Sequence, residues 1–305
     1  MAYERVAVLM GGLSAERAVS LESGEAVARA LERGGREVFR IDAGRDLDRH
    51  LRETEPQAAF VALHGRLGED GCVQGLLESM GIPYTGSGVA ASSLAMDKAR
   101  ARHVLVAAGV PVAPGGVLDE GSHDLPPGLS LPVVVKPTNE GSSVGVAIVR
   151  EPGALEPAIA AARATASAVL VEAFVAGAEV NVAVLDGRVL GAVEIVANAG
   201  EFYDFASKYQ PGGSTHHIPP RLPADAIDAA CLLGRKAYEA IGCAGAARVD
   251  LIVTPAGEPV VLEVNTVPGM TVTSLLPEIA AWAGIPFDEL VSMMIDGARL
   301  HVSLA

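Results

Sequence analysis

The first 95 residues alternate short apolar runs with amphipathic segments, a pattern typical of a parallel sheet covered by helices. The strand RVAVLMGG precedes SAERAVSLESGEAVARALERGG, in which apolar residues recur at helical spacing. We expect Ser14 to cap this helix and Gly34 or Gly35 to end it. EVFRI and AAFVALH supply further strands. The segment is therefore predicted to form a small α/β domain that binds ligands at the carboxyl ends of its strands.

The middle of the chain changes to an α+β pattern. A helix through MDKARARHVLVAAG is expected to end at Gly109. Strands are predicted at PVVVKP, SSVGVAIV and VLVEAFV, with one alanine-rich helix among them.

The last part of the chain begins with the strands of EVNVAVLDGRVLGAVEIV, which Asp186 and Gly187 join as a tight hairpin turn. The irregular segment 197–220 has the length of a lid or binding loop, and a long helix is expected from about Pro223. A hairpin and two helices close the chain. We therefore predict three domains, at residues 1–95, 96–179 and 180–305.

Composition narrows the classes of function. The 305 residues carry a formal net charge of −14, which disfavours binding to nucleic acid or to anionic membranes. The longest uncharged stretch, 104–118, contains two prolines and several glycines and cannot form a spanning helix. Three cysteines without metal-ligand spacing predict free thiols, and no leader precedes the first strand. We expect a cytoplasmic protein.

The segment VVLEVNTVPGM carries the strongest chemical signal. Strand alternation places Glu263 and Asn265 on one face, and ARVDLIV places Arg248 and Asp250 on one face of the preceding strand. The TPAGEP turn between them predicts a hairpin that pairs Asp250 with Glu263 and Arg248 with Asn265. This polar face fits a hard cation and a polyphosphate, whereas apolar positions 249, 251, 253, 260, 262 and 264 are expected to face the core. The alternative is a solvated hairpin with a surface ion pair.

PVVVKPTNEGSSVGV is a second candidate phosphate site. Lys136 ends a strand, and the turn after it offers backbone N–H groups and the hydroxyls of Ser142 and Ser143. The turn lacks the spacing of a Walker loop, and the first strand lacks GxGxxG, so a nicotinamide cofactor is disfavoured. An ordinary flexible hairpin remains the alternative.

Two further motifs are ambiguous from the residues alone. Glu172 ends a strand and Glu179 follows a glycine-containing connection, so they fit either a nucleotide hinge or two solvated glutamates. LHGRLGEDG places His64 after a strand of the first domain, where it contacts a substrate or is a satisfied loop histidine. Asp70 in the same motif is expected to cap a helix.

Together with GGLSAER, YTGSG, MDK, YDFASKY and NTVPGMTVTSL, these motifs make the chain resemble the D-alanine–D-alanine ligases of the ATP-grasp superfamily. The motifs occur in family order from Glu16 to Leu275. The resemblance implies an ATP-grasp fold with an N-terminal parallel α/β domain, a central nucleotide-binding domain and a C-terminal mixed α+β domain. It also implies ATP-dependent joining of two D-alanine molecules through a D-alanyl phosphate, for peptidoglycan precursor synthesis, by a homodimer.

The resemblance assigns roles to individual residues. Phosphates would be held by Lys98, Lys136, Ser143 and Lys208, and magnesium, with manganese as an alternative, by Asp250, Glu263 and Asn265. The adenine would meet Glu172, Phe174 and Val175, and the ribose Glu179. The first D-alanine would meet Glu16, His64, Arg248 and the Gly269 backbone, and the second Ser274 and Leu275. Ser142 and Tyr209 would orient the substrates with Glu16.

The chain departs from the family pattern at Phe205, where tyrosine is common, and at Asn181, where a small hydroxyl residue is common. It also departs at THHIPP, which contains His216 and His217 and replaces an aromatic-bearing lid segment of the family. Two other functions remain open. One is a ligase joining D-alanine to D-lactate, which the pair Lys208 and Tyr209 disfavours. The other is a catalytically silent nucleotide-binding module, which retention of the lysines and of the metal-type residues disfavours.

Overall fold

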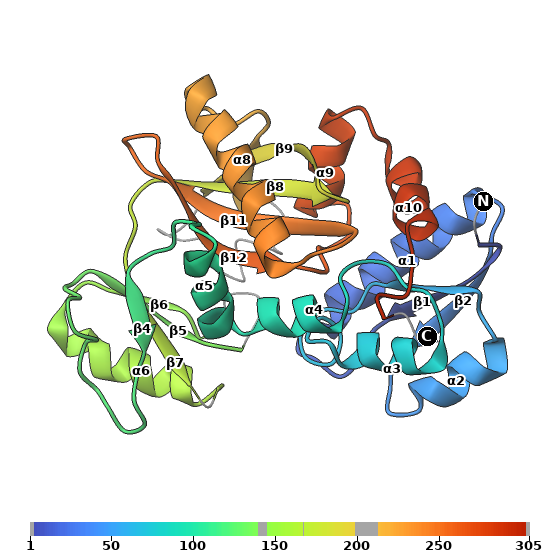
Figure 1. Cartoon of the computed structure of the whole chain (residues 1–305), viewed down its shortest axis with the longest axis horizontal. Coiled ribbons are helices and arrows are strands. Elements are labelled where there is room, and N and C mark those ends of the chain that lie inside the picture. The colour runs from blue at the N-terminus through green and yellow to red at the C-terminus, as the bar shows by residue number, and fades with distance from the viewer. Residues whose placement is uncertain (1–2, 140–144, 167, 199–212, 303–305) are drawn as a thin grey trace.

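The computed structural model describes residues 3–139, 145–166, 168–198 and 213–302. Three sheets organise this part of the chain, and Figure 1 shows the N-terminal sheet and a four-stranded sheet at opposite ends of the molecule. A five-stranded sheet lies between and above them. None of the helices in the described part of the chain is both long and apolar enough to cross a membrane.

The N-terminal sheet is parallel, with the order β2-β1-β3, as the alternating pattern predicts. Its elements are β1 (Arg5–Met10), α1 (Arg17–Arg33), β2 (Glu37–Asp42), α2 (Leu47–Thr54), β3 (Ala58–Val61) and α3 (Cys72–Met80). The helix α1 ends at Gly34 as expected, but its N-cap residue is Glu16 rather than Ser14. Ser14 instead accepts a hydrogen bond from the Glu16 N–H and donates one to the His64 carbonyl, which ties the first turn of α1 to the end of β3.

The four-stranded antiparallel sheet has the order β4-β7-β5-β6, and α4 and α5 connect it to the N-terminal sheet. Its elements and the connecting helices are α4 (Val89–Met96), α5 (Lys98–Ala107), β4 (Gly115–Val117), β5 (Val133–Pro137), β6 (Ala147–Val149), η1 (Pro152–Ala154), α6 (Leu155–Arg163) and β7 (Val169–Ala173). Asp97 caps α5 by accepting the Arg100 N–H, so the helix begins with Lys98. The end of β5 and the start of α5 thus bring two lysines toward the molecular centre.

The five-stranded antiparallel sheet has the order β10-β9-β8-β11-β12. It is formed by β8 (Ala178–Leu185), β9 (Arg188–Ala197), β10 (Ser214–His217), β11 (Ala246–Val253) and β12 (Pro259–Asn265), and is followed or covered by α8 (Ala224–Ile241), α9 (Leu275–Trp282) and α10 (Phe287–Asp296). Asp186 and Gly187 form the predicted tight turn, both with positive φ. The segment expected to be irregular contains a strand, β10, because Ser214–His217 pair with β9.

The predicted hairpin has the expected register, with one difference. Arg248 pairs with Asn265 and Asp250 with Glu263, but the register shifts by one residue between Asp250 and Leu251. The irregularity leaves Leu262 without an opposite residue, so Val261 and not its two neighbours enters the core beside β11. The expectation that positions 260 and 262 face the core is therefore wrong, since strict alternation fails at a bulge.

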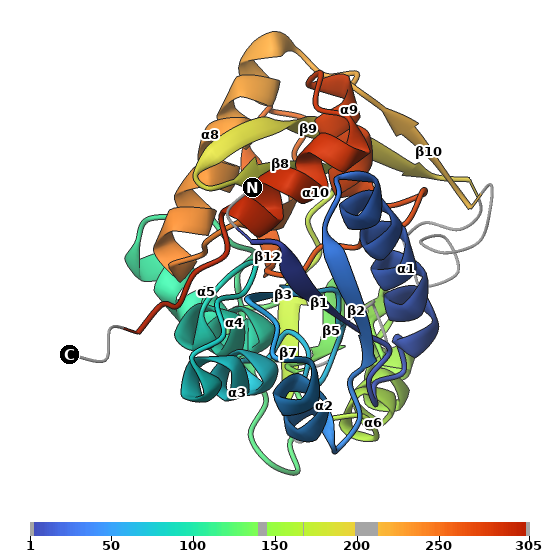
Figure 2. The same ribbon diagram turned by 90° about the vertical axis from the view of Figure 1, so that its right-hand side faces the viewer.

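One hydrophobic core joins both ends of the sequence. Buried residues of β1 and α1 pack with residues of β9, α9 and α10. Figure 2 shows α10 beside α1, where Arg33 and Asp288 form an ion pair of 2.6 Å. The carboxyl ends of the N-terminal strands are thereby held against the segment that follows β12.

Candidate active site

A cavity of about 90 Å³ lies where the N-terminal sheet, the hairpin β11–β12 and the start of α9 meet. Nine residues that the sequence singled out line it: Glu16, His64, Lys98, Arg248, Glu263, Asn265, Gly269, Ser274 and Leu275. These residues come from distant parts of the chain, so their convergence depends on the fold.

The hairpin supplies the charged wall of this cavity. Arg248 donates from Nε and Nη2 to the two oxygens of Asp250, at 2.6 and 2.7 Å, and both side chains are largely buried. On the neighbouring strand, the Glu263 carboxylate lies 3.2 Å from the Lys98 ammonium. Each carboxylate therefore already faces a cation, and a polyphosphate entering here would meet Arg248 and Lys98 beside them.

The donor set fits a hard cation, because Asp250, Glu263 and Asn265 offer two carboxylates and an amide oxygen on adjacent strands. Among the described residues, no three His, Cys, Asp or Glu side chains form a group that could hold a metal ion. Asn181 of β8 pairs with Asp250 of β11. Its side chain is buried, and its Nδ2 has no hydrogen-bond partner within the described ranges.

The opposite wall comes from the N-terminal sheet. A Cβ added at Gly65, which has φ +70°, would lie 2.9 Å from Glu16 Oε2, so the Glu16 carboxylate packs directly on this glycine. His64 is buried, and burial lowers its pKa to about 4, although its hydrogen bond to the Val267 backbone opposes the shift. His64 is therefore a neutral imidazole at pH 7, with Nε2 3.5 Å from Ser23 Oγ.

Glu69 is a cavity residue to which the sequence assigned no role. Its carboxylate accepts the Gly65 N–H at 2.8 Å, and burial together with the nearby Glu16 raises its pKa to about 8. The motif LHGRLGEDG contained the signal, since Glu69 lies at the carboxyl end of β3. Asp70 accepts the N–H of Cys72, the first residue of α3, but the N-cap of this helix is Gly71, so the expectation that Asp70 is the N-cap is wrong by one residue.

We expect Glu69→Gln to flatten the dependence of stability on pH in the ligand-free protein. A carboxyl whose folded-state pKa is raised binds a proton that the unfolded chain releases, so its contribution is complete below the ordinary glutamate pKa of about 4.3 and is lost as pH rises toward 8. Over that window the natural protein should lose up to ~1.4 kcal/mol per pH unit from this group. Urea unfolding at several pH values measures it, and parallel curves for the two proteins would contradict the expectation.

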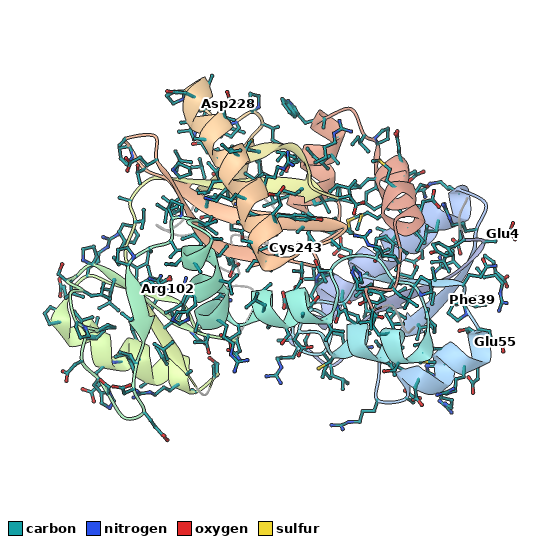
Figure 3. All side chains as sticks on the ribbon, in the orientation of Figure 1. Glu4, Phe39, Glu55, Arg102, Asp228 and Cys243 are labelled. Carbon is teal, nitrogen blue, oxygen red and sulfur yellow. The ribbon has the colours of Figure 1, made fainter. Side chains whose placement is uncertain are left out.

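A second, narrower hollow continues from the cavity between α5, β7 and β12. It shares Lys98 and Glu263 with the first cavity and is lined further by Arg102, Leu170 and Glu172. The Glu172 carboxylate contacts Lys136 Nζ at 2.5 Å and Arg102 Nη1 at 3.0 Å. Arg102, which the sequence did not single out, lies on α5 toward the four-stranded sheet (Figure 3).

The other proposed nucleotide residues lie just after β7 and at the start of β8. Phe174 follows β7 and stacks under the Arg150 guanidinium at 5.1 Å, and Val175 is half-buried beside it. Glu179 lies at the start of β8, half-buried, opposite Ile252 of β11.

Replacing Glu172 by Gln is expected to weaken nucleotide binding, because the change leaves the largely buried Lys136 and Arg102 without their carboxylate. We expect the KM for ATP to rise about tenfold, and the free energy of unfolding to fall by ~3 kcal/mol. Glu156→Gln, on the exposed side of α6, is the matched control. An unchanged KM for ATP with lowered stability would leave the ion pairs a purely structural role.

The end of the cavity nearest α9 is formed by a tight turn. A Cβ added at Gly269 would come within 2.6 Å of Ser274 Oγ, so the backbone approaches here without room for a side chain. Ser274 Oγ accepts the Thr271 N–H at 3.0 Å, and Leu275 begins α9. Thr271, which also lines the cavity, was not foreseen.

Four proposed residues, Ser142, Ser143, Lys208 and Tyr209, lie outside the described residues, as does Phe205. Their roles stay predictions.

The three sheets and the polar cavity at their centre define a protein of the ATP-grasp fold. The D-ala D-ala ligase C-terminus family model matches residues 107–296 and the N-terminus model residues 44–87. A D-alanine--D-alanine ligase of Citrifermentans bemidjiense is 52% identical over 299 residues, covering 98% of this chain and 97% of that protein. The chain belongs to the D-alanine–D-alanine ligase family.

Solved structures agree with this assignment. The crystal structure of D-alanine--D-alanine ligase from Bacillus anthracis is similar at a TM-score of 0.86 and 36% identity, covering 96% of each chain. The structure of the Bacillus anthracis ligase complexed with ATP gives a TM-score of 0.83 at 34% identity, covering 96% of this chain and 97% of that one.

Proposed function

We propose that this protein joins two D-alanine molecules to D-alanyl-D-alanine at the expense of ATP, with release of ADP and phosphate, for peptidoglycan precursor synthesis. The observation that carries the proposal is the single cavity shared by Glu16 and His64 on one wall and Lys98, Arg248 and Glu263 on the other. Carboxylate, neutral imidazole and guanidinium suit an amino acid, whereas Lys98 beside the Glu263 carboxylate suits a polyphosphate and its cation.

A carboxylate is a poor electrophile, so the first D-alanine must be activated before an amine can attack it. Transfer of the γ-phosphoryl group converts it to a D-alanyl phosphate, and Lys98 is suited to hold the transferred phosphate. Arg248 and Gly269 both line the cavity, and the guanidinium and a backbone N–H near Gly269 would stabilise the tetrahedral oxyanion. Ser274 and Leu275 would hold the second D-alanine, whose neutral amine attacks the acyl carbon and displaces phosphate.

Magnesium, with manganese as an alternative, is proposed at Asp250, Glu263 and Asn265, where it would neutralise charge on the transferred phosphate. On the nucleotide side, Lys136, Ser143 and Lys208 are proposed to hold phosphates. Glu172, Phe174 and Val175 would frame the adenine, and Glu179 the ribose. Ser142 and Tyr209 would orient the substrates with Glu16.

We further propose that the protein is a cytoplasmic homodimer that acts on small molecules and contacts neither nucleic acid nor membrane. We also propose that its domains comprise residues 1–95, 96–179 and 180–305. The acidic net charge of −14 supports the exclusion of nucleic acid.

The proposal is tested by phosphate release from ATP and magnesium, assayed in parallel with D-alanine, L-alanine or D-alanine plus D-lactate. Release with D-alanine and a dipeptide product identified by mass spectrometry is the expected result. Preferential incorporation of D-lactate at neutral pH would make the protein a depsipeptide ligase. ATP binding without release under any condition would make it a silent module.

A further inference from the structure

His216 of β10 makes two polar contacts outside the cavity. Its Nδ1 lies 2.6 Å from Glu278 Oε2, and its Nε2 lies 3.0 Å from Ser214 Oγ on the same strand. The imidazole is 17% exposed and the Glu278 side chain 39%, so the contact is shielded on the histidine side. Because β10 is the edge strand of the five-stranded sheet, this pair joins that edge to α9.

Glu278 lies one helical turn from the start of α9, and its N–H donates to the Ser274 carbonyl at 3.3 Å. Ser274 Oγ in turn accepts the Thr271 N–H, and Ser274 and Leu275 line the cavity. Glu278 therefore links β10 to the first turn of α9, since its side chain contacts His216 and its backbone N–H bonds the Ser274 carbonyl.

Packing fixes the other side of the same helix. Leu276 and Ile279 are buried in the core shared with β9, so the helix is seated against the sheet by apolar contacts. These contacts do not bond the polar first turn directionally, whereas the pair of His216 and Glu278 does. A displacement of about 1 Å at a reacting group can cost orders of magnitude in rate, so a directional restraint on this turn has a functional consequence.

We propose that His216 is a positioning residue for the acceptor subsite, and that it acts through Glu278 on the turn carrying Ser274 and Leu275. The proposal rests on the proposed function, in which these two residues hold the second D-alanine. His216 itself touches neither substrate, since it does not line the cavity.

Hydrolases also use a serine, a histidine and an acidic residue as a catalytic triad, but the arrangement of Ser214, His216 and Glu278 favours a positioning role. A serine nucleophile needs a substrate cavity and oxyanion donors at its hydroxyl. Ser214 does not line the active-site cavity, and it lies beside His216 as the next same-face residue of one strand.

Three substitutions at His216 separate the two contacts. Asn places an amide nitrogen close to the position of Nδ1 and can retain the bond to Glu278, whereas Gln reaches the position of Nε2 and Ala reaches neither. His217→Ala is the matched control, because His217 is the next residue of β10 and its side chain points to the opposite face of the sheet.

Initial rates of ADP release over a wide range of D-alanine concentrations, at saturating ATP, give one KM for the donor site and one for the acceptor site. We expect His216→Ala and His216→Gln to raise the acceptor KM about tenfold, with the donor KM and the KM for ATP unchanged. His216→Asn should stay within about twofold of the natural protein, as should His217→Ala.

An unchanged acceptor KM in His216→Ala, or an equal rise of both D-alanine KM values, would overturn the proposal. If the acceptor KM rose in His216→Asn but stayed normal in His216→Gln, the contact with Glu278 would not be the one that matters, and the path through Glu278 would be overturned. The proposed function fails separately, because it requires only that the unsubstituted protein makes the dipeptide.

Discussion

Glu263→Gln is expected to lower ADP formation by at least ~10³-fold while leaving the fold intact. The side chain lines the cavity, pairs across the hairpin with Asp250 and contacts Lys98 at 3.2 Å. Substitution removes one negative charge from the place where transferred phosphate and its cation must be balanced, and such stabilisation is worth several kcal/mol. Because the side chain is 30% exposed, the amide fits the same space without a cavity, although Lys98, which is 12% exposed, loses its carboxylate partner.

The measurement is ADP release with saturating D-alanine and magnesium. Circular dichroism and the urea midpoint report on the fold. Glu258→Gln is the matched control, because it makes the same chemical change in the exposed turn of the same hairpin. Near-normal ADP formation in Glu263→Gln would remove this residue from the proposed metal site.

Local sequence rules predicted the elements of this fold well where periodicity and turn chemistry agree. The hairpin β11–β12 follows from alternation around a proline- and glycine-containing turn, and the turn at Asp186 and Gly187 follows from their tolerance of positive φ. The register that places Asp250 opposite Glu263 followed from the same rules, since a hairpin turn fixes the register of its strands.

Contacts set by tertiary structure were not predictable in this way. Glu16 occupies the N-cap that Ser14 was expected to fill, because Ser14 is bonded to the His64 carbonyl from another strand. The bulge that turns Val261 inward leaves no signal in an apolar run where every neighbour is also apolar. Strand β10 was assigned to a loop because four polar residues acquire strand structure only by pairing with β9.

In the candidate site, too, residues in recognisable motifs were predicted, whereas residues whose role depends on tertiary contacts were not. Motif order along the chain identified nine residues that the fold brings to one cavity. Glu69 and Arg102 were not assigned, because their significance arises from what surrounds them: the Glu16 carboxylate in one case and the Glu172 carboxylate in the other. A charged residue in a helix or loop is most often solvated, and only the folded neighbourhood distinguishes these two.

Substitution of Arg248 should lower activity nearly as much as substitution of Glu263, but for two separable reasons. Its guanidinium is bidentate on Asp250, with 15% of the arginine and 7% of the aspartate side chain exposed. It also lines the cavity at the proposed oxyanion position. Arg248→Met should therefore lose both a transition-state donor, at a cost of ~10²–10³ in kcat, and the partner of a buried carboxylate, at a cost of ~3–5 kcal/mol in unfolding free energy.

Two further variants separate these effects. Arg248→Lys keeps the charge but loses the fork, so stability should largely recover while kcat stays at least about tenfold low. The double substitution Arg248→Met with Asp250→Asn removes both buried charges, so it should restore most of the stability and none of the activity. Arg235→Met, at an exposed ion pair on α8, controls for loss of an arginine and should change neither quantity appreciably. Urea unfolding and steady-state ADP release distinguish the outcomes, and a double variant that regained turnover would show that Arg248 acts only by neutralising Asp250.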